Sequence, residues 1–249
     1  MQPFSLDSCV ELLCRLVATP SVSGSEDGTA DILFDVLKQH GATVNRLYNN
    51  IWVVSEGFDT QKPTIMLNSH HDTVKAAGGY TFDPHCGAVV DGKILGLGSN
   101  DAGSSVVSLM ALFSRFSDTK NLPFNLILAI TAEEETMGER GMRAMLTHFK
   151  EQGIKIDMAI VGEPTAMQAA VGERGLVVLD GLATGKSGHA ARNEGDNALY
   201  KAVEDIALLR DYKFGKTSEV LGDIKISVTQ IAAGSQHNIV PDSCSFVVD

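Results

Sequence analysis

The sequence predicts an α/β fold in which a mixed, largely parallel sheet is flanked by helices and followed by a smaller α+β domain. Over the first two thirds of the chain, segments with apolar residues at helical spacing alternate with apolar, strand-like runs. Near Gly172 this alternation gives way to a β-α-β-β run. We therefore expect residues 1–172 to form the larger domain and residues 173–249 to form the smaller one.

The larger domain is expected to begin with two amphipathic helices. Residues 6–18 carry apolar side chains at helical spacing, and Thr19-Pro20 ends the pattern. A polar turn leads into a second helix over residues 26–40, where Gly41 supplies the stop.

Two short hairpins are also expected in this half. Strands over residues 42–48 and 51–55 are joined by Asn49-Asn50, and asparagine tolerates the positive φ of a tight turn. Residues 89–94 form the second hairpin around Asp91-Gly92.

The remaining elements follow from the same periodicities. In the larger domain we expect helices over residues 103–116 and 138–152. In the smaller domain we expect strands over residues 176–183, 224–231 and 238–248, a helix over 197–211, and a flexible loop over 185–189.

Four segments end in residues that bind metals. The apolar run from Thr64 ends in His70-His71-Asp72, and another ends in Glu133-Glu134-Glu135. Asp101 lies in a glycine-rich loop after the strand that begins at Lys93, and Glu163 follows a further apolar run. In an α/β sheet the carboxyl ends of strands meet in one crevice, and carboxylates gathered there repel one another unless cations neutralise them. The pattern predicts a two-metal site.

Composition excludes several classes of function. The net charge of −11, with no lysine-rich run, argues against a nucleic-acid partner. The four cysteines lack CxxC spacing, which is typical of reduced thiols. No apolar stretch reaches the roughly 20 residues of a membrane helix, and the start lacks a signal-peptide pattern. We expect a cytoplasmic protein that binds neither nucleic acid nor membrane.

The motifs at these segment ends resemble those of the M20 zinc aminoacylases and deacylases. They are His70-x-Asp72, Gly98-Ser-Asn-Asp101, Thr131-Ala-Glu-Glu134-Glu135 and Gly162-Glu163-Pro-Thr. The resemblance covers essentially the whole chain, in order and with similar spacing. It implies a zinc-exopeptidase-like catalytic domain and a smaller lid and dimerisation domain.

The resemblance also assigns roles in binding two Zn²⁺ ions, with Co²⁺ as an alternative metal. His70 and Glu163 would bind one ion, Glu135 the other, and Asp101 would bridge both. Asp72 would accept the proton on the second ring nitrogen of His70 and fix the orientation of that ring.

Glu134 would be the general base for hydrolysis. The resemblance implies a cis peptide bond between Asp101 and Ala102 as well. His71, the variable middle residue of its motif, is expected to be a solvated or internally satisfied side chain.

In the smaller domain, the resemblance points to three residues near a substrate. His189 would reach the partner subunit's active site from the lid and stabilise an oxyanion. Asn238 would contact substrate, and Arg174 would grip a carboxylate or form a hinge salt bridge. A homodimer through the lid is expected.

Members of the family are longer than this chain, with a C-terminal segment that completes the sheet and carries a second zinc-binding histidine. We therefore expect the sequence to be a fragment that lacks this segment.

The expected reaction is zinc-dependent hydrolysis of the amide of an N-acyl-L-ornithine, N-acetyl or N-succinyl, to L-ornithine in arginine biosynthesis. The residues of the motifs around His70 and Asp101 resemble those of the acetylornithine deacetylase branch. Arg174 and Arg192 are candidates for binding a succinyl carboxylate. The alternatives are a succinyl-diaminopimelate desuccinylase, an M20 dipeptidase and, from another class, a catalytically dead dimerising relative. A two-metal phosphoesterase is disfavoured because no cation cluster accompanies the ligand motifs.

Overall fold

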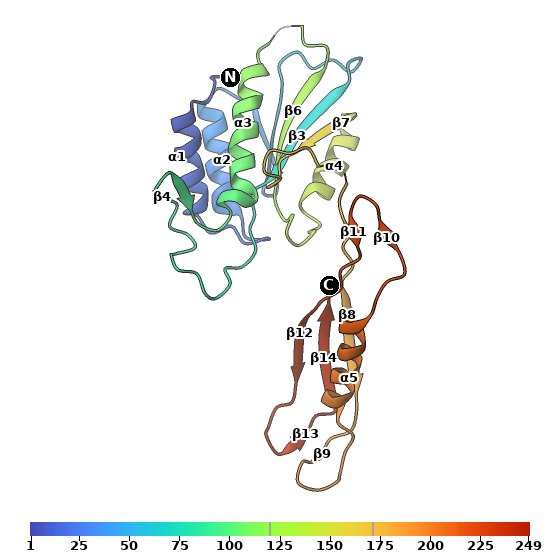
Figure 1. The fold of residues 1–249 in the computed structure, drawn as a ribbon. Helices are drawn as coiled ribbons and strands as arrows, with labels where there is room; N and C mark the ends of the chain where they lie inside the picture. The colour runs from blue at the N-terminus through green and yellow to red at the C-terminus, as the bar shows by residue number, and fades with distance from the viewer. Residues whose placement is uncertain (120, 171) are drawn as a thin grey trace. The chain divides into compact units, whose positions relative to one another are not determined.

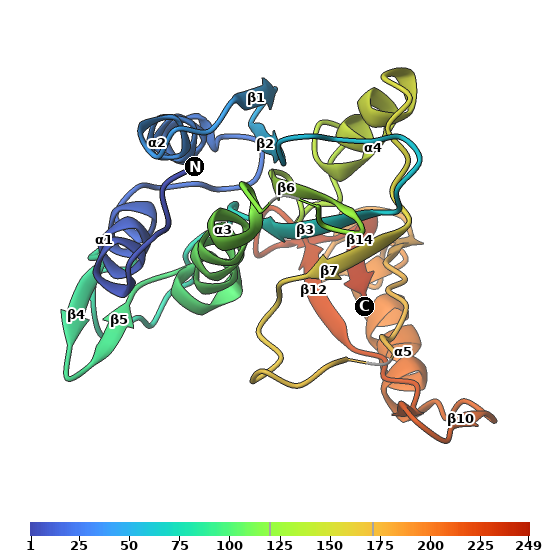
Figure 2. The ribbon, with the colours of Figure 1, turned by 90° about the horizontal axis from the view of Figure 1, so that it is seen from above.

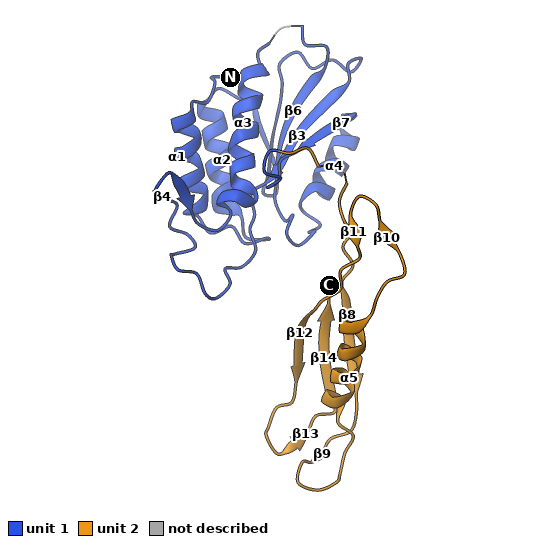
Figure 3. Ribbon diagram, in the orientation of Figure 1, with its two compact units in different colours: residues 1–167 blue, residues 168–249 orange. Residues whose placement is uncertain are grey.

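The computed structural model describes residues 1–119, 121–170 and 172–249. They form two compact units, Met1–Met167 and Gln168–Asp249 (Figure 3). The catalytic and lid roles expected for residues 1–172 and 173–249 stay predictions.

Unit 1 is built on a mixed five-stranded sheet in the order β1-β2-β6-β3-β7 (Figure 1). Its strands are β1 (Val44–Leu47), β2 (Asn50–Val54), β3 (Thr64–His70), β6 (Asn125–Thr131) and β7 (Met158–Val161). β3 runs parallel to both β6 and β7, whereas β2 is antiparallel to β1 and β6. The α/β prediction is confirmed.

Helices cover both faces of this sheet (Figure 2). One face packs against α1 (Leu6–Val17), α2 (Asp27–Gln39) and α3 (Ser104–Phe116), and the other against α4 (Met142–Glu151). Every residue of β6 is buried. Alternate side chains of a strand point to opposite faces of the sheet, and helices cover both of these faces. Leu128 therefore joins the core under α1–α3, whereas Ile127 joins the core under α4.

The first hairpin of unit 1 departs from the prediction. Leu47 pairs with Asn50, so the two loop residues are Tyr48 and Asn49, and the positive φ falls on Tyr48 at 54°. The expectation that Asn49-Asn50 would supply it is wrong. Asn50 is the first residue of β2, and its buried side chain donates to the Leu47 carbonyl at 2.9 Å.

The second hairpin, β4 (Ala88–Val90) with β5 (Lys93–Leu95), is confirmed. Asp91 and Gly92 have φ of 49° and 75°, which is the geometry of a two-residue primed turn. However, this hairpin is not part of the main sheet. Asp101 therefore does not follow a strand of that sheet. It lies in η1 (Ser99–Gly103), a wide turn that leads into α3 and in which the backbone of Asp101 itself is not helical.

Unit 2 contains a three-stranded antiparallel sheet in the order β12-β14-β8, with α5 (Ala198–Asp211) packed on one face. Its strands are β8 (Leu179–Thr184), β12 (Val228–Ala233) and β14 (Ser243–Val248). Two short antiparallel pairs complete it, β9 (Gly188–His189) with β13 (Ile239–Val240) and β10 (Thr217–Ser218) with β11 (Gly222–Asp223). Asn197 caps α5 by accepting the Leu199 N–H at 2.9 Å.

Two strand predictions in unit 2 need correction. The strand expected over residues 224–231 lies at Val228–Ala233. The run expected over 238–248 divides into β13 and β14, because Pro241 has no N–H for a ladder. Among the helices of the described chain, none combines the length and the apolar composition needed to cross a bilayer.

Candidate metal centre

The site forms where three parallel strands of unit 1 end. His70 at the end of β3 pairs with Thr131 at the end of β6, and Asn68 pairs with Val161 at the end of β7. The residues that follow these strands share one edge of the sheet, which is where an α/β fold places its ligands. The register therefore brings His70, Glu134 and Glu163 to one place.

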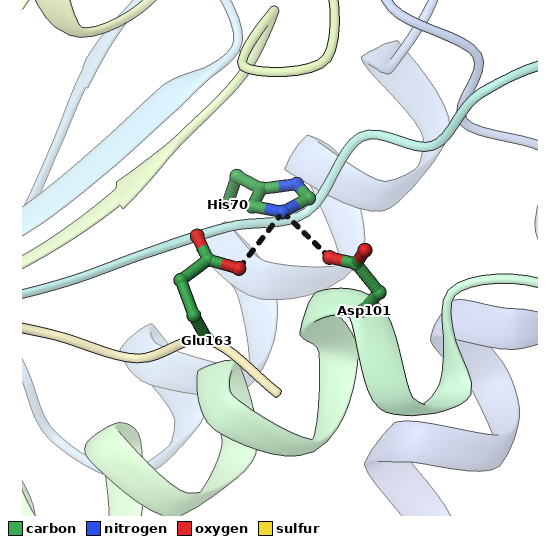
Figure 4. A group of neighbouring side chains, drawn as sticks. All are labelled: His70, Asp101 and Glu163. Atoms are coloured by element: carbon green, nitrogen blue, oxygen red, sulfur yellow. Dashed lines mark hydrogen bonds and ion pairs between the residues drawn. The ribbon is translucent and has the colours of Figure 1, made fainter. Parts of the chain in front are cut away.

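Three of the predicted ligands form a group whose donor atoms all lie within 4.8 Å of one another: His70, Asp101 and Glu163. The Nε2 atom of His70 is 3.1 Å from Asp101 Oδ1 and 3.8 Å from Glu163 Oε2 (Figure 4). His70 is buried, whereas both carboxylates are reached by solvent. A metal ion could therefore reach this group from the crevice.

Asp72 fixes the imidazole of His70 from behind. The Nδ1 atom lies 3.1 Å from the Asp72 carbonyl oxygen and 3.3 Å from its carboxylate Oδ1. Both neighbours are acceptors, which assigns a proton to Nδ1. In the neutral imidazole, Nε2 is then left free to bind a metal toward Asp101 and Glu163.

The electrostatics of this pair follow from burial and hydrogen bonding. Burial opposes a charge on His70, but hydrogen bonds to Asp72 and Glu163 and their negative charges outweigh it and raise the pKa of His70 to about 11. Burial likewise opposes the charge of Asp72. Hydrogen bonds from His70, Ser23 and two backbone N–H groups outweigh it and lower the pKa of Asp72 to about 2.

The donor set fits a divalent metal. One imidazole nitrogen and two carboxylates converge on a common point, and these are ligand types that zinc accepts. Gathered carboxylates without a cation would repel one another. The residues present therefore suit a metal ion at His70, Asp101 and Glu163.

Glu134 lies beside this group, with Oε2 3.9 Å from His70 Nε2. Burial raises the pKa of Glu134, and the nearby charges of Glu163, Asp72 and Asp101 raise it further against the opposing effect of His70. A carboxylate with a raised pKa at the mouth of a metal site has the properties of a general base.

A cavity of about 340 Å³ adjoins these residues. Its lining includes His70, Glu134 and Glu163 together with the apolar Met137 and with Arg143. Arg143 is the one arginine or lysine among the described residues that line it, and sequence analysis did not identify it as a site residue. It forms an ion pair with the exposed Glu139, at 3.0 Å.

Glu135, the predicted ligand of a second metal, lies outside the compact group. Burial raises the pKa of Glu135, and the charge of Asp101 contributes to the rise. Its role with Asp101 in a second metal site stays a prediction. The expected cis peptide bond between Asp101 and Ala102 is present.

Side chains that the sequence analysis missed support the loop after β6. Ser23 Oγ donates to Asp72 Oδ2 at 2.5 Å, and the Glu26 and Asn50 side chains accept backbone N–H groups of the loop. Ser23 and Glu26 lie in and just after a polar turn that carries no local pattern. Only their tertiary contacts reveal them, that of Ser23 with Asp72 and that of Glu26 with the Glu133 N–H.

His71 is buried and internally satisfied, in agreement with the prediction. Its Nε2 lies 2.9 Å from the Asn49 carbonyl oxygen, and its Nδ1 lies 2.8 Å from the Thr29 hydroxyl. Burial lowers the pKa of His71. A neutral ring that donates through Nε2 and accepts through Nδ1 satisfies both contacts.

In unit 2 the structure brings two of the predicted residues together. His189 pairs with Ile239 in the β9–β13 ladder, and the Asn238 carbonyl accepts the Ala190 N–H at 3.0 Å. The Nδ1 atom of His189 accepts the Ala191 N–H at 3.1 Å, so the neutral ring carries its proton on Nε2. Arg174 instead donates to the Leu221 carbonyl. His189, Asn238 and Arg174 stay predicted substrate residues.

Comparison with known proteins identifies relatives over nearly the whole chain. The chain is 31% identical to a succinyl-diaminopimelate desuccinylase of Zymomonas mobilis, over 93% of this chain and 64% of the relative. It is 29% identical to succinyl-diaminopimelate desuccinylase 2 of a Ruegeria species, over 94% of this chain and 62% of the relative. The chain thus spans less than two thirds of the length of these relatives.

Solved structures share the fold. An M20 family metallo-carboxypeptidase from Sulfolobus solfataricus matches with a TM-score of 0.62 and 17% identity, over 98% of this chain and 70% of that one. A Bacillus subtilis protein described as a dinuclear metal-binding peptidase of the M20 family matches with a TM-score of 0.58 and 15% identity, over 97% and 63%.

The model of peptidase family M20/M25/M40 matches residues 66–236, more than half of the chain. This match spans the ligand motifs from His70 to Glu163 and continues into unit 2. The chain belongs to the peptidase family M20/M25/M40.

Proposed function

We propose that this chain is the metal-binding part of a metal-dependent amidohydrolase that removes the succinyl group from succinyl-diaminopimelate. The observation that carries the reaction class is the group of His70, Asp101 and Glu163 with Glu134 beside it. A metal site adjoining a carboxylate of raised pKa suits hydrolysis of an amide by water.

We further propose two Zn²⁺ ions as the resident metals, with Co²⁺ as an alternative. His70 and Glu163 would hold one ion, Glu135 the other, and Asp101 would bridge them. A relative by fold is described as dinuclear, which supports a count of two. When bound, the metal supplies Lewis acidity at the site.

The residues of the chain divide the remaining work. Asp72 keeps the ring of His70 in one orientation. Glu134 takes a proton from the attacking water as the new C–O bond forms, and it gives that proton to the leaving amine nitrogen as the C–N bond breaks. The products are a free amine and a carboxylic acid, and the base is regenerated.

The relatives support the choice of acyl group and amine. Those at 31% and 29% identity are both succinyl-diaminopimelate desuccinylases. The ornithine substrate predicted from the motifs, with its place in arginine biosynthesis, has less support than this alternative. Arg143, on the wall of the cavity that contains Glu134, would suit the free carboxylate of a succinyl group.

Unit 2 would contribute contacts to substrate. We propose that His189, which carries its proton on Nε2, donates to the developing oxyanion of a partner subunit's substrate, and that Asn238 beside it contacts substrate. This role requires a homodimer, and we propose a cytoplasmic one. Arg174 would then serve as a hinge residue, since its guanidinium is held by the Leu221 carbonyl.

The test is amine release by the zinc-loaded protein from three substrates: succinyl-diaminopimelate, N-succinyl-L-ornithine and N-acetyl-L-ornithine. Turnover of succinyl-diaminopimelate well above the other two supports the proposal. If the protein prefers an ornithine derivative, the proposed substrate is wrong and the proposed mechanism still holds. Tight zinc binding without hydrolysis of any of the three would favour a catalytically dead relative.

A further inference from the structure

The loop after β6 is held by side chains rather than by a neighbouring strand. Four successive backbone N–H groups, from Ala132 to Glu135, donate to side-chain oxygens. Asn50 Oδ1 accepts from Ala132 at 3.0 Å, Glu26 Oε1 from Glu133 at 3.2 Å, and Asp72 from Glu134 and Glu135 at 3.1 Å each. Buried N–H groups need partners, and here three distant side chains supply them.

Glu26 is the member of this set that the proposed mechanism does not use. It is 1% exposed and lies at the amino end of α2, where the helix dipole favours a negative charge. Its carboxylate also accepts the Gly24 N–H at 2.6 Å and the Asn49 side-chain amide at 3.1 Å. Since Arg46 donates to Asn49 Oδ1 at 2.9 Å, the NH₂ group of Asn49 must face Glu26.

Burying a carboxylate this completely is costly unless donors surround it, and no cationic side chain is paired with Glu26 among the ion pairs of the described residues. The carboxylate is directed at the N–H of Glu133, immediately before Glu134.

That backbone has an uncommon conformation. Glu133 has a φ of 55°, in the left-handed region that non-glycine residues rarely adopt. Its N–H is held by Glu26, its carbonyl accepts the Gly138 N–H at 2.8 Å, and its own carboxylate accepts the Arg140 N–H at 3.0 Å. The φ of Glu133 sets the direction in which the chain enters Glu134 and Glu135.

We propose that Glu26 is a positioning residue for catalysis, which acts by holding the Glu133 N–H and thereby aims the carboxylates of Glu134 and Glu135 at the metal site. This inference rests on the proposed function for the roles of Glu134 and Glu135. Asp72 fixes the two N–H groups that follow, but it does not determine the turn at Glu133.

The first test compares Glu26→Ala with Ser55→Ala. Ser55 is also buried, and its hydroxyl accepts the Leu126 N–H at 3.1 Å near the opposite end of β6. Ser55→Ala removes the acceptor of one backbone N–H in β6, whereas Glu26→Ala removes the acceptor of the Glu133 and Gly24 N–H groups and of the Asn49 amide. Ser55→Ala therefore controls for the loss of a buried backbone acceptor away from the site. Kinetics on succinyl-diaminopimelate are measured well below both melting temperatures.

In the zinc-loaded protein, Glu26→Ala should lower kcat about 10- to 100-fold and leave KM within about threefold, because a small displacement of a catalytic group has effects of this size. Ser55→Ala should keep kcat within about twofold. An unchanged kcat in Glu26→Ala, or an equal loss in both variants, would overturn the proposal.

A compensating pair tests the hydrogen bonds themselves. Glu26→Gln alone places an NH₂ group against the Asn49 NH₂ group, whereas Glu26→Gln with Asn49→Asp restores a donor facing an acceptor and keeps an acceptor for Arg46. The double variant should recover kcat to within about threefold of the wild type. A double variant as slow as Glu26→Ala would contradict a role exerted through this network.

If the wild-type protein hydrolyses none of the substrates, the proposed function fails, and amide hydrogen exchange decides the inference separately. In the zinc-loaded protein, Glu26→Ala should speed exchange of the N–H groups of residues 133–135 at least tenfold, and Ser55→Ala should not. Unchanged exchange in Glu26→Ala would overturn the positioning role.

Discussion

The fully buried carboxylate of Asp72 accepts the backbone N–H of Glu134 at 3.1 Å, and so joins the strand that carries His70 to the loop that carries the proposed base. Its other oxygen accepts the Glu135 N–H at 3.1 Å and the Ser23 hydroxyl at 2.5 Å. One side chain thus orients the proposed metal ligand His70 and anchors the segment opposite it. Asp72 has this double task because β3 and β6 are parallel neighbours in register.

Asp72→Asn should impair both metal binding and turnover. The amide offers only one accepting oxygen to the N–H groups of Glu134 and Glu135, and its NH₂ group opposes the donor on His70 Nδ1. We expect zinc affinity to fall about 10- to 100-fold, measured by titration calorimetry. Asp157→Asn is the control, since Asp157 accepts the Thr64 N–H at 2.9 Å at the far end of β3. Equal affinities for Asp72→Asn and wild type would remove Asp72 from the metal site.

Glu134→Gln should abolish most turnover and leave the first metal site intact. The amide cannot take a proton, and general base catalysis contributes about 10²- to 10⁴-fold. The group of His70, Asp101 and Glu163 does not include Glu134, so zinc content should be unchanged. Rates and zinc content are measured on one preparation, with Glu151→Gln on the exposed end of α4 as control. A Glu134→Gln enzyme of normal rate would assign the base elsewhere.

Removal of metal should lower the melting temperature. A ligand present at about 100 times its Kd stabilises the native state by about 2.7 kcal/mol, which corresponds to about 5–10 °C for a chain of this size. Chelation should produce this loss in the wild type because it removes the stabilisation that the bound metal supplies to the native state. The thermal scan of His70→Ala should be insensitive to zinc. A zinc-dependent shift of full size in His70→Ala would place the main site away from His70.

Arg143→Ala should weaken binding of succinyl substrates selectively. Arg143 and Glu134 line the same cavity, and the exposed pair of Arg143 with Glu139 is of the kind that contributes little to stability. We expect KM to rise about tenfold for N-succinyl substrates, since charge-assisted hydrogen bonds of this kind contribute about 1.5–3 kcal/mol, and less than twofold for N-acetyl ones. Arg140→Ala is the matched control, because Arg140 lies over the Tyr48 ring at 5.6 Å. Parallel changes for both acyl groups would rule out recognition of the succinyl carboxylate.

Much of unit 1 could be predicted from sequence because its signals are local. The apolar run that ends in His70 and the one that ends before Glu133 are buried on both faces of the sheet, so they read as continuous hydrophobic strands. Asp91-Gly92 specifies its hairpin by backbone preference alone. Asn49-Asn50 failed as a similar signal because tertiary hydrogen bonds recruit Asn50 into β2.

By itself, the sequence determined the short motifs that carry the proposed metal ligands. It also determined the family, because these motifs are short and can be read along the chain. The tertiary structure alone decided what holds those ligands. The hydrogen bonds from Glu133 to Glu26 and from Glu134 to Asp72 join residues 107 and 62 positions apart. Such pairs depend on how parallel strands and a polar turn pack together, and no local pattern encodes that packing.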